Sequence, residues 1–360
     1  MIEEIKKLLL QLVEIDSPSG EENGIIKFLK KKYEEIGIHL QEDNSGNLYA
    51  EIEGKGDYLL LSAHMDTVNP GKGKKAVVNA DGIISSDGTT ILGADDYSGL
   101  VEIYEVAKYV MDNHIPHKAI ELLFTTGEER YCVGAKKFDF RKVKAKTAYV
   151  LDLSGPVGRA AYAAPTILLF EAVVRGKAAH AGFNPEEGIH AIQAASRAIG
   201  KLQLGKVKEG VTGNVGIMQG GKGTNIVPDE VRIQGEIRSM QHEDAIRLAD
   251  EYRCIFEEES AASGATVSWE EEIHIQAYET LLESKAVKEF ENAVKAVGPS
   301  PKLEKTFGGS DQNVFAQKGI EGIVVANSMY NVHSVEEYTN LFEMEKVVEI
   351  LKEIVRNEEI

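Results

Sequence analysis

Residues 121–130 read ELLFTTGEER, an apolar strand-like run that stops at Gly127 and is followed at once by two carboxylates, Glu128 and Glu129. Adjacent carboxylates repel one another and cost desolvation free energy unless a cation lies beside them. This stretch therefore raises two questions: which kind of sheet the strand belongs to, and which positive charge lies at its end.

Strand-like and helix-like segments alternate on both sides of this stretch. YLLLSAH (58–64) is followed by a helical pattern over 98–112, and AIELLFTT (119–126) is followed by TAYVLDL (147–153). Such alternation is typical of an α/β domain, and it predicts a mostly parallel sheet with helices on both faces.

The pattern changes after residue 165. A strand, a helix, two strands, a helix and a strand then follow, which is the split βαβ order of ferredoxin-like α+β domains. The first pattern resumes with the strand GIVVAN (322–327) and a closing amphipathic helix at 342–357. We therefore expect a discontinuous α/β domain of residues 1–165 and 277–360, interrupted by an inserted α+β domain of residues 166–276.

Charge and composition argue against two classes of partner. Lys and Arg total 40 against 58 Asp and Glu, and the resulting formal net charge of −18 repels nucleic acid and anionic membrane surfaces. No apolar run in the sequence approaches the roughly 18 residues that a membrane span needs. Cys132 and Cys254 lie far apart without metal-site spacing, which favours reduced thiols in a cytoplasmic protein.

Imidazoles and carboxylates follow the predicted strands of the outer domain, and an acidic pair precedes its long helix. Because sites in open α/β sheets lie outside the carboxyl ends of the strands, these side chains should converge. Two imidazoles with several carboxylates and no cysteine suit Zn²⁺, Mn²⁺ or Co²⁺, and the size of the group suits two ions. Taken singly, an acid before a helix is also a common cap, and a GEE triplet is also a common turn. The residues concerned are His64, Asp66, Asp95, Asp96, Glu128, Glu129, Asp152 and His333.

Seven motifs contain these residues or lie between them. They are SAHMDTV (62–68), GADDYSG (93–99), TTGEE (125–129), YVLD (149–152), GKAAHAGFNPEEGIHAI (176–192), GGKGTNIVPD (220–229) and NVHS (331–334). Together they resemble the M20 family of dinuclear zinc peptidases, in its peptidase T-like branch. The resemblance implies a zinc-peptidase-like mixed sheet flanked by helices, with the inserted domain acting as a lid and dimerisation domain.

The same resemblance implies a set of metal ligands. One ion would be held by His64, Asp95 and Asp152, and a second by Asp95, Glu129 and His333, so that Asp95 bridges the two. The ions would be zinc, with manganese or cobalt as alternatives. Family members also have a cis peptide between the two aspartates, here Asp95 and Asp96.

The resemblance also implies catalytic roles. Glu128 would be the general base that takes a proton from water held between the ions. The carboxylate of Asp66, two residues after His64, would accept the second imidazole N–H and fix the metal-binding tautomer. His180 would stabilise the oxyanion, in many family members from the neighbouring subunit, which predicts a homodimer formed through the inserted domain. Substrate contacts would come from Asn225, Arg238 and the glycine-rich loop Gly308, Gly309 and Ser310.

These features predict a cytoplasmic metallopeptidase that hydrolyses short peptides, with removal of the N-terminal residue as the expected activity. A deacylase or carboxypeptidase-like amidohydrolase is an alternative, because AAHAGFNPEEGIHAI (178–192) looks closer to the carboxypeptidase-like branch. A catalytically silent dimeric binding protein is an alternative of another class, although such a protein would be expected to lose a ligand or the base. No GxGxxG or P-loop motif follows the early strands, which disfavours a nucleotide-binding protein.

Overall fold

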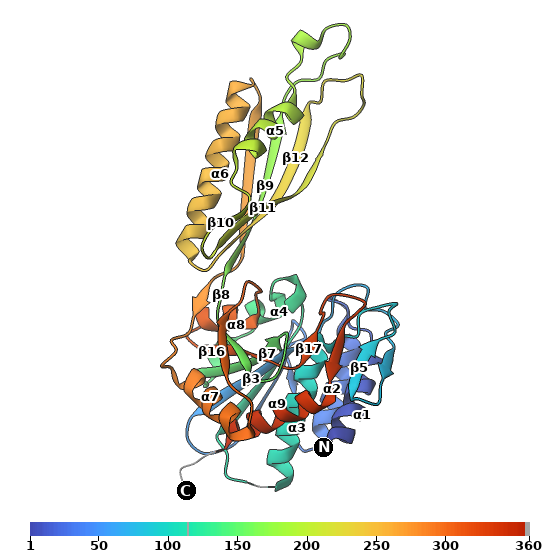
Figure 1. Cartoon of the computed structure of the whole chain (residues 1–360), viewed down its shortest axis with the longest axis vertical. Coiled ribbons are helices and arrows are strands. Elements are labelled where there is room, and N and C mark those ends of the chain that lie inside the picture. Colours follow the sequence, from blue (N-terminus) through green and yellow to red (C-terminus); the bar gives the residue numbers. More distant parts are fainter. Residues whose placement is uncertain (114, 357–360) are drawn as a thin grey trace. The chain divides into compact units, whose positions relative to one another are not determined.

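The computed structural model describes residues 1–113 and 115–356, which form two compact units (Figure 1). The first unit contains Met1–Ala163, Glu279–Thr306 and the described residues from Ser310 onward. The second contains Ala164–Tyr278 and Phe307–Gly309. The expected insertion was residues 166–276. It did not include Phe307–Gly309, because these residues return to the second unit about 30 residues after the chain first leaves it.

Within the described residues, the first unit is built on a nine-stranded mixed sheet in the order β1-β2-β6-β3-β7-β16-β8-β14, with β15 paired to β8. Its centre is parallel: β3 (Tyr58–His64) lies between β6 (Ala119–Thr125) and β7 (Thr147–Leu153), and β16 (Glu321–Ala326) pairs with β7. The predicted mixed sheet is therefore confirmed. The outer strands are β1 (Gln41–Glu42), β2 (Leu48–Ile52), β8 (Arg159–Ala164), β14 (Tyr278–Glu279) and β15 (Lys302–Lys305).

Helices cover both faces of this sheet, which explains the continuous apolar run of β3. Leu59 and Leu61 join a core cluster with the helices of one face, whereas Leu60 is fully buried outside that cluster. A parallel strand with helices on both faces needs apolar residues along most of its length, not only at alternate positions. Figure 1 shows α3, α7 and α9 on one side of the sheet and α4 and α8 on the other. The helices are α1 (Ile2–Val13), α2 (Asn23–Glu34), α3 (Ala94–Asn113), α4 (Val133–Lys137), α7 (Lys285–Val297), α8 (Asp311–Gln317) and α9 (Leu341–Val355).

The second unit is a five-stranded antiparallel sheet in residues 164–278, in the order β10-β11-β12-β9-β13, with α5 and α6 packed on it. The predicted strand and helix order is confirmed. The four-residue strand β10 (Gly205–Lys208), which is too short and polar to give a period-two signal, adds an edge. The other elements are β9 (Thr166–Arg175), α5 (Ala191–Lys201), β11 (Val211–Gly220), β12 (Glu230–Ser239), α6 (His242–Ala262) and β13 (Thr266–Ile275).

A small sheet in the described part of the first unit brings two distant loops together. Its order is β17-β18-β5-β4, so the hairpin that carries NVHS pairs with the segment preceding GADDYSG. The sequence pattern did not reveal these strands because each has only two to four residues. They are β4 (Ala76–Val78), β5 (Ile83–Ser86), β17 (Met329–Tyr330) and β18 (Tyr338–Asn340). Among the residues described, no helix combines the length and apolar character needed to cross a membrane.

Candidate metal centre

The candidate ligands come from segments far apart in the sequence that meet at one edge of the first unit's sheet. His64 is the last residue of β3, and Asp152 is the penultimate residue of β7. Glu129 follows β6 in the 3-10 turn Glu128–Arg130. Asp95 lies at the kinked start of α3, and His333 lies between β17 and β18. The carboxyl ends of neighbouring parallel strands thus bring these side chains together at one edge of the sheet.

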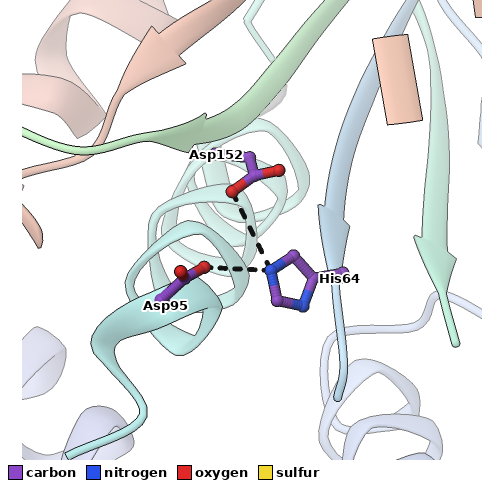
Figure 2. Close-up of side chains that lie close together, drawn as sticks. All are labelled: His64, Asp95 and Asp152. Carbon is purple, nitrogen blue, oxygen red and sulfur yellow. Dashed lines mark hydrogen bonds and ion pairs between the residues drawn. The ribbon is translucent and has the colours of Figure 1, made fainter. Parts of the chain in front are cut away.

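The first group contains His64, Asp95 and Asp152, whose side chains point toward one another in Figure 2. His64 Nε2 lies 3.0 Å from Asp95 Oδ1 and 3.8 Å from Asp152 Oδ1. One ligand-type atom from each residue lies within 4.8 Å of the other two. Three ligand-type atoms this close together are a group that could hold one metal ion.

The second group contains Asp95, Glu129 and His333. His333 Nε2 lies 3.1 Å from Asp95 Oδ2 and 2.9 Å from Glu129 Oε1. Asp95 therefore directs one oxygen to each histidine and belongs to both groups. The expected cis peptide is also present between Asp95 and Asp96.

The electrostatics of the two groups suit divalent cations. Burial raises the pKa of Glu128 well above its usual value, and the negative charge of nearby Asp152 raises it further. Burial also raises the pKa of Asp152. Hydrogen bonds with Asp95 and Glu129 raise the pKa of His333 to about 11. Without ions, the carboxylates compete for two imidazole protons, and bound dications would supply the missing positive charge. The donor set of imidazole nitrogens and carboxylate oxygens fits such ions.

Asp66 holds the backbone of the adjacent glutamates in addition to lying beside the His64 imidazole, its expected partner. Its carboxylate accepts the backbone N–H of Glu128 at 2.9 Å, the backbone N–H of Glu129 at 3.2 Å and the hydroxyl of Ser19 at 2.6 Å. The acceptor nearest to His64 Nδ1 is the backbone carbonyl oxygen of Asp66, at 2.9 Å, and the carboxylate lies farther away, at 3.5 Å. The backbone oxygen of Asp66 is thus the nearer acceptor for the imidazole, and its carboxylate, 3.5 Å from Nδ1, also binds the GEE turn.

Two further residues, which the sequence pattern did not single out, support the aspartate pair. Glu337 is fully buried and accepts backbone N–H groups of Leu92, Gly93 and Asp95 at 2.7, 2.8 and 2.9 Å. Asn327 donates its amide to Asp96 Oδ1 at 2.6 Å. Both lie more than 200 residues from their partners, so no local motif identified them.

Asp96 itself combines two functions. Its Oδ1 accepts the N–H of Gly99 at 3.2 Å, a capping bond in the first turn of α3. Its Oδ2 accepts the backbone N–H of His64 at 3.1 Å, which joins the start of α3 to the end of β3. The capping alternative considered for this residue therefore describes part of its role.

The expected oxyanion and substrate residues His180, Asn225 and Arg238 lie in the second unit. His180 Nδ1 accepts the backbone N–H groups of Gly182 and Phe183, both at 3.1 Å, which leaves the ring proton on Nε2 as an available donor. The backbone oxygen of Asn225 accepts the N–H of Ala181, so the two loops lie together. The guanidinium of Arg238 is held by Glu236 and by the backbone oxygen of Phe307.

The glycine-rich loop is divided between the units. Gly308 and Gly309 belong to the second unit, whereas Ser310 is the residue that precedes α8 in the first. The backbone N–H of Ser310 donates to Asn313 Oδ1 at 3.1 Å, and Ser310 is the N-cap residue of α8. A substrate contact by this loop stays a prediction.

Comparisons with known proteins match both parts of the chain. A model of a peptidase dimerisation domain (M20_dimer) matches residues 162–263, and a model of peptidase family M28 matches residues 47–194. The chain is 38% identical to the uncharacterized protein YqjE of Bacillus subtilis over 97% of its own length and 98% of that protein. It is 26% identical to peptidase T of Clostridium perfringens over 99% of both chains.

Two solved structures have the same fold as this protein along nearly the whole chain. The aminopeptidase PepT of Bacillus cereus has a TM-score of 0.93 and 36% identity, with 99% of this chain and 98% of that chain covered. A tripeptidase of Staphylococcus aureus has a TM-score of 0.95 and 32% identity, with the same coverage. Identity above 30% over full-length chains shows common family membership rather than a shared fold alone.

Proposed function

The chain belongs to the peptidase T-like branch of the M20 metallopeptidases, and from this premise we propose that it is an aminopeptidase that removes the N-terminal residue from short peptides. Members of this family are metal-dependent peptidases. The observation that carries the proposal is the position of Asp95, which directs one oxygen to each of two histidine–carboxylate groups. The names of the two full-length solved relatives, an aminopeptidase and a tripeptidase, support the substrate class.

The proposed cofactor is a pair of divalent ions, with zinc preferred and manganese or cobalt as alternatives. His64 and Asp152 would hold one ion, Glu129 and His333 the other, and Asp95 both. When bound, the ions would polarise the scissile carbonyl and lower the pKa of the attacking water. The described residues supply an imidazole and at least two carboxylates to each group.

The proposed general base is Glu128, which stands next to the ligand Glu129 in the GEE turn. It takes a proton from the attacking water and passes that proton to the departing amine. Asp66 supports this role because it binds the backbone N–H of Glu128 and so fixes where the side chain starts. The two adjacent carboxylates of the opening stretch thus divide binding and proton transfer between them.

The second unit is proposed to supply the oxyanion donor and the dimer contact. His180 would donate from Nε2 to the developing oxyanion, and the ring has that proton available because Nδ1 accepts two backbone N–H groups. The match of residues 162–263 to a peptidase dimerisation domain supports a homodimer. Asn225 and Arg238 are proposed to contact the substrate, and a cytoplasmic location stays a prediction.

The test of the substrate class uses a free-amine tripeptide and its N-acetylated twin, each incubated with the metal-loaded protein and analysed by mass spectrometry. We expect loss of the first residue from the free peptide only. Cleavage restricted to the acetylated peptide would contradict the proposal and support a deacylase or carboxypeptidase.

The test of the base is Glu128→Gln, with the exposed Glu283→Gln as its matched control. The amide keeps the size of the side chain but accepts no proton, so kcat should fall by about three powers of ten while two equivalents of metal remain bound. Glu283→Gln should keep the activity of the parent. A Glu128→Gln enzyme of near-parental kcat would remove this residue from the proposed role.

A further inference from the structure

A third group of ligand-type side chains lies beside Glu128. Glu128, Cys132 and Asp311 each place one donor atom within 4.8 Å of the other two, and Cys132 Sγ lies 3.5 Å from Glu128 Oε1. Cys132 and Asp311 are each only 1% exposed, whereas Glu128 is partly buried. This group, called the thiol cluster below, contains sulfur, which the two groups of the candidate metal centre lack.

The backbone fixes all three members of the thiol cluster. The N–H of Cys132 donates to the backbone oxygen of Glu128 at 2.8 Å, and Cys132 has a left-handed φ of 59°, which L-residues seldom adopt. Asp311 is the first residue of α8, which packs against α4, the helix that follows Cys132. Cys132, just before α4, and Asp311, at the start of α8, are therefore held at the ends of two packed helices, and Glu128 is joined to Cys132 through the turn.

Asp311 has one carboxylate oxygen without a partner. Its Oδ2 accepts the hydroxyl of Thr125, but its Oδ1 has no hydrogen-bond donor among the described residues. Leaving a buried carboxylate oxygen unsatisfied is costly, and such atoms in native proteins commonly face an ion or water. A fully buried member of the thiol cluster thus has a carboxylate oxygen that is available to a further partner such as an ion.

The chemistry and spacing of the cluster suit a zinc-like ion. A tetrahedral ion with sulfur at about 2.3 Å and oxygen at about 2.1 Å holds those two ligands about 3.6 Å apart. The observed separation of Sγ and Oε1 is 3.5 Å. One thiolate and two carboxylates would fill three positions of a tetrahedral ion and leave the fourth to water. Water could reach the ion on the side of Glu128, because this side chain is only partly buried.

We propose that the thiol cluster is a third metal site, which takes a zinc-like divalent ion and inhibits the enzyme when filled. The ion displaces the thiol proton to solvent and is then bound by the Cys132 thiolate and by the carboxylates of Glu128 and Asp311. Binding makes the Glu128 carboxylate a ligand, so it no longer accepts a proton. The inhibition rests on the proposed role of Glu128 as base, whereas the site itself does not.

The spectroscopic test titrates cobalt(II) into the full-length protein preloaded with two equivalents of zinc. Cys254→Ser provides the background, because the sequence has two cysteines and this change leaves Cys132 as the sole thiol. We expect a near-ultraviolet thiolate-to-cobalt charge-transfer band, which neither sulfur-free group can produce. The band should disappear in Cys132→Ser and weaken at least tenfold in apparent affinity in Asp311→Asn. Far-ultraviolet circular dichroism checks the folding of each variant.

The activity test compares each protein with itself at two and at many equivalents of zinc. Excess zinc should lower the activity of the Cys254→Ser protein, and reaching the same fractional loss in the variant that also carries Cys132→Ser should need at least tenfold more zinc. No band, or a band that Asp311→Asn leaves unchanged, overturns the site. A band without inhibition supports the site but overturns the inhibitory role, and the separate Glu128→Gln experiment still decides whether Glu128 is the base.

Discussion

Replacing Asp66 with Asn tests how the GEE turn is held. The buried carboxylate accepts three bonds: Oδ1 binds the N–H of Glu128, and Oδ2 binds the N–H of Glu129 and the hydroxyl of Ser19. An amide has one oxygen and one NH₂ group. In its better orientation it keeps the two bonds at the Oδ2 position and turns its NH₂ toward the N–H of Glu128, where two donors face each other.

The magnitude follows from these three bonds. An unsatisfied buried donor costs about 1–3 kcal/mol, and each retained bond loses about 1 kcal/mol when its acceptor becomes neutral. The turn should therefore lose about 3–5 kcal/mol of local stabilisation. If misplacement of Glu128 raises the activation free energy by about 3 kcal/mol of this amount, kcat falls by about two powers of ten, because each 1.4 kcal/mol is a factor of ten.

The assay measures kcat, KM and bound metal for Asp66→Asn and for Ser19→Ala. Ser19→Ala removes one donor and keeps the carboxylate, so it should cost about 1 kcal/mol or less. Metal content should persist in Asp66→Asn, since the backbone oxygen of Asp66, not its side chain, is the nearest acceptor for His64 Nδ1. Loss of metal, with a parental kcat recovered when metal is resupplied in excess, would refute this reasoning and restore the carboxylate as the partner of the imidazole.

Three further outcomes are expected. Gly134→Ala should lower the free energy of unfolding by about 1–3 kcal/mol in urea titrations, because its Cβ would lie 2.3 Å from the backbone oxygen of Thr126. Gly200→Ala, whose Cβ meets nothing within 4 Å, should not destabilise the protein. Burial lowers the pKa of Lys74 to about 8 from 10.5, so between these values the unfolded chain binds more protons and folding gains stability as pH rises. The parent should therefore gain about 2 kcal/mol over Lys74→Met between pH 8 and 10, and equal pH profiles of the two proteins would contradict the shift. Chelation should abolish hydrolysis and lower the melting temperature, with about 2.7 kcal/mol restored per site at a hundredfold excess of ion over its dissociation constant. Unchanged melting on chelation would show that the ions do not stabilise the folded state.

Local sequence patterns predicted many of the strands and helices of the first unit. The runs at 58–64 and 147–153 became β3 and β7 with those bounds, because parallel strands covered on both faces are apolar along most of their length. Since parallel strands share one carboxyl edge, the same patterns also brought His64, Asp152 and the GEE turn together. The short strands of the β4, β5, β17 and β18 sheet escaped prediction because two to four residues carry no readable period.

By itself, the sequence determined the alternation of elements, the ligand types at the strand ends and the family to which the chain belongs. Only the tertiary structure decided which atoms those residues use. Asp66 turns its carboxylate to the GEE turn, Glu337 binds a loop more than 240 residues away, and Asp311 joins Cys132 beside Glu128. Periodicity and turn chemistry are properties of neighbouring residues, whereas these contacts arise when packed helices and strands bring distant polar groups into one buried space, where each must find a partner.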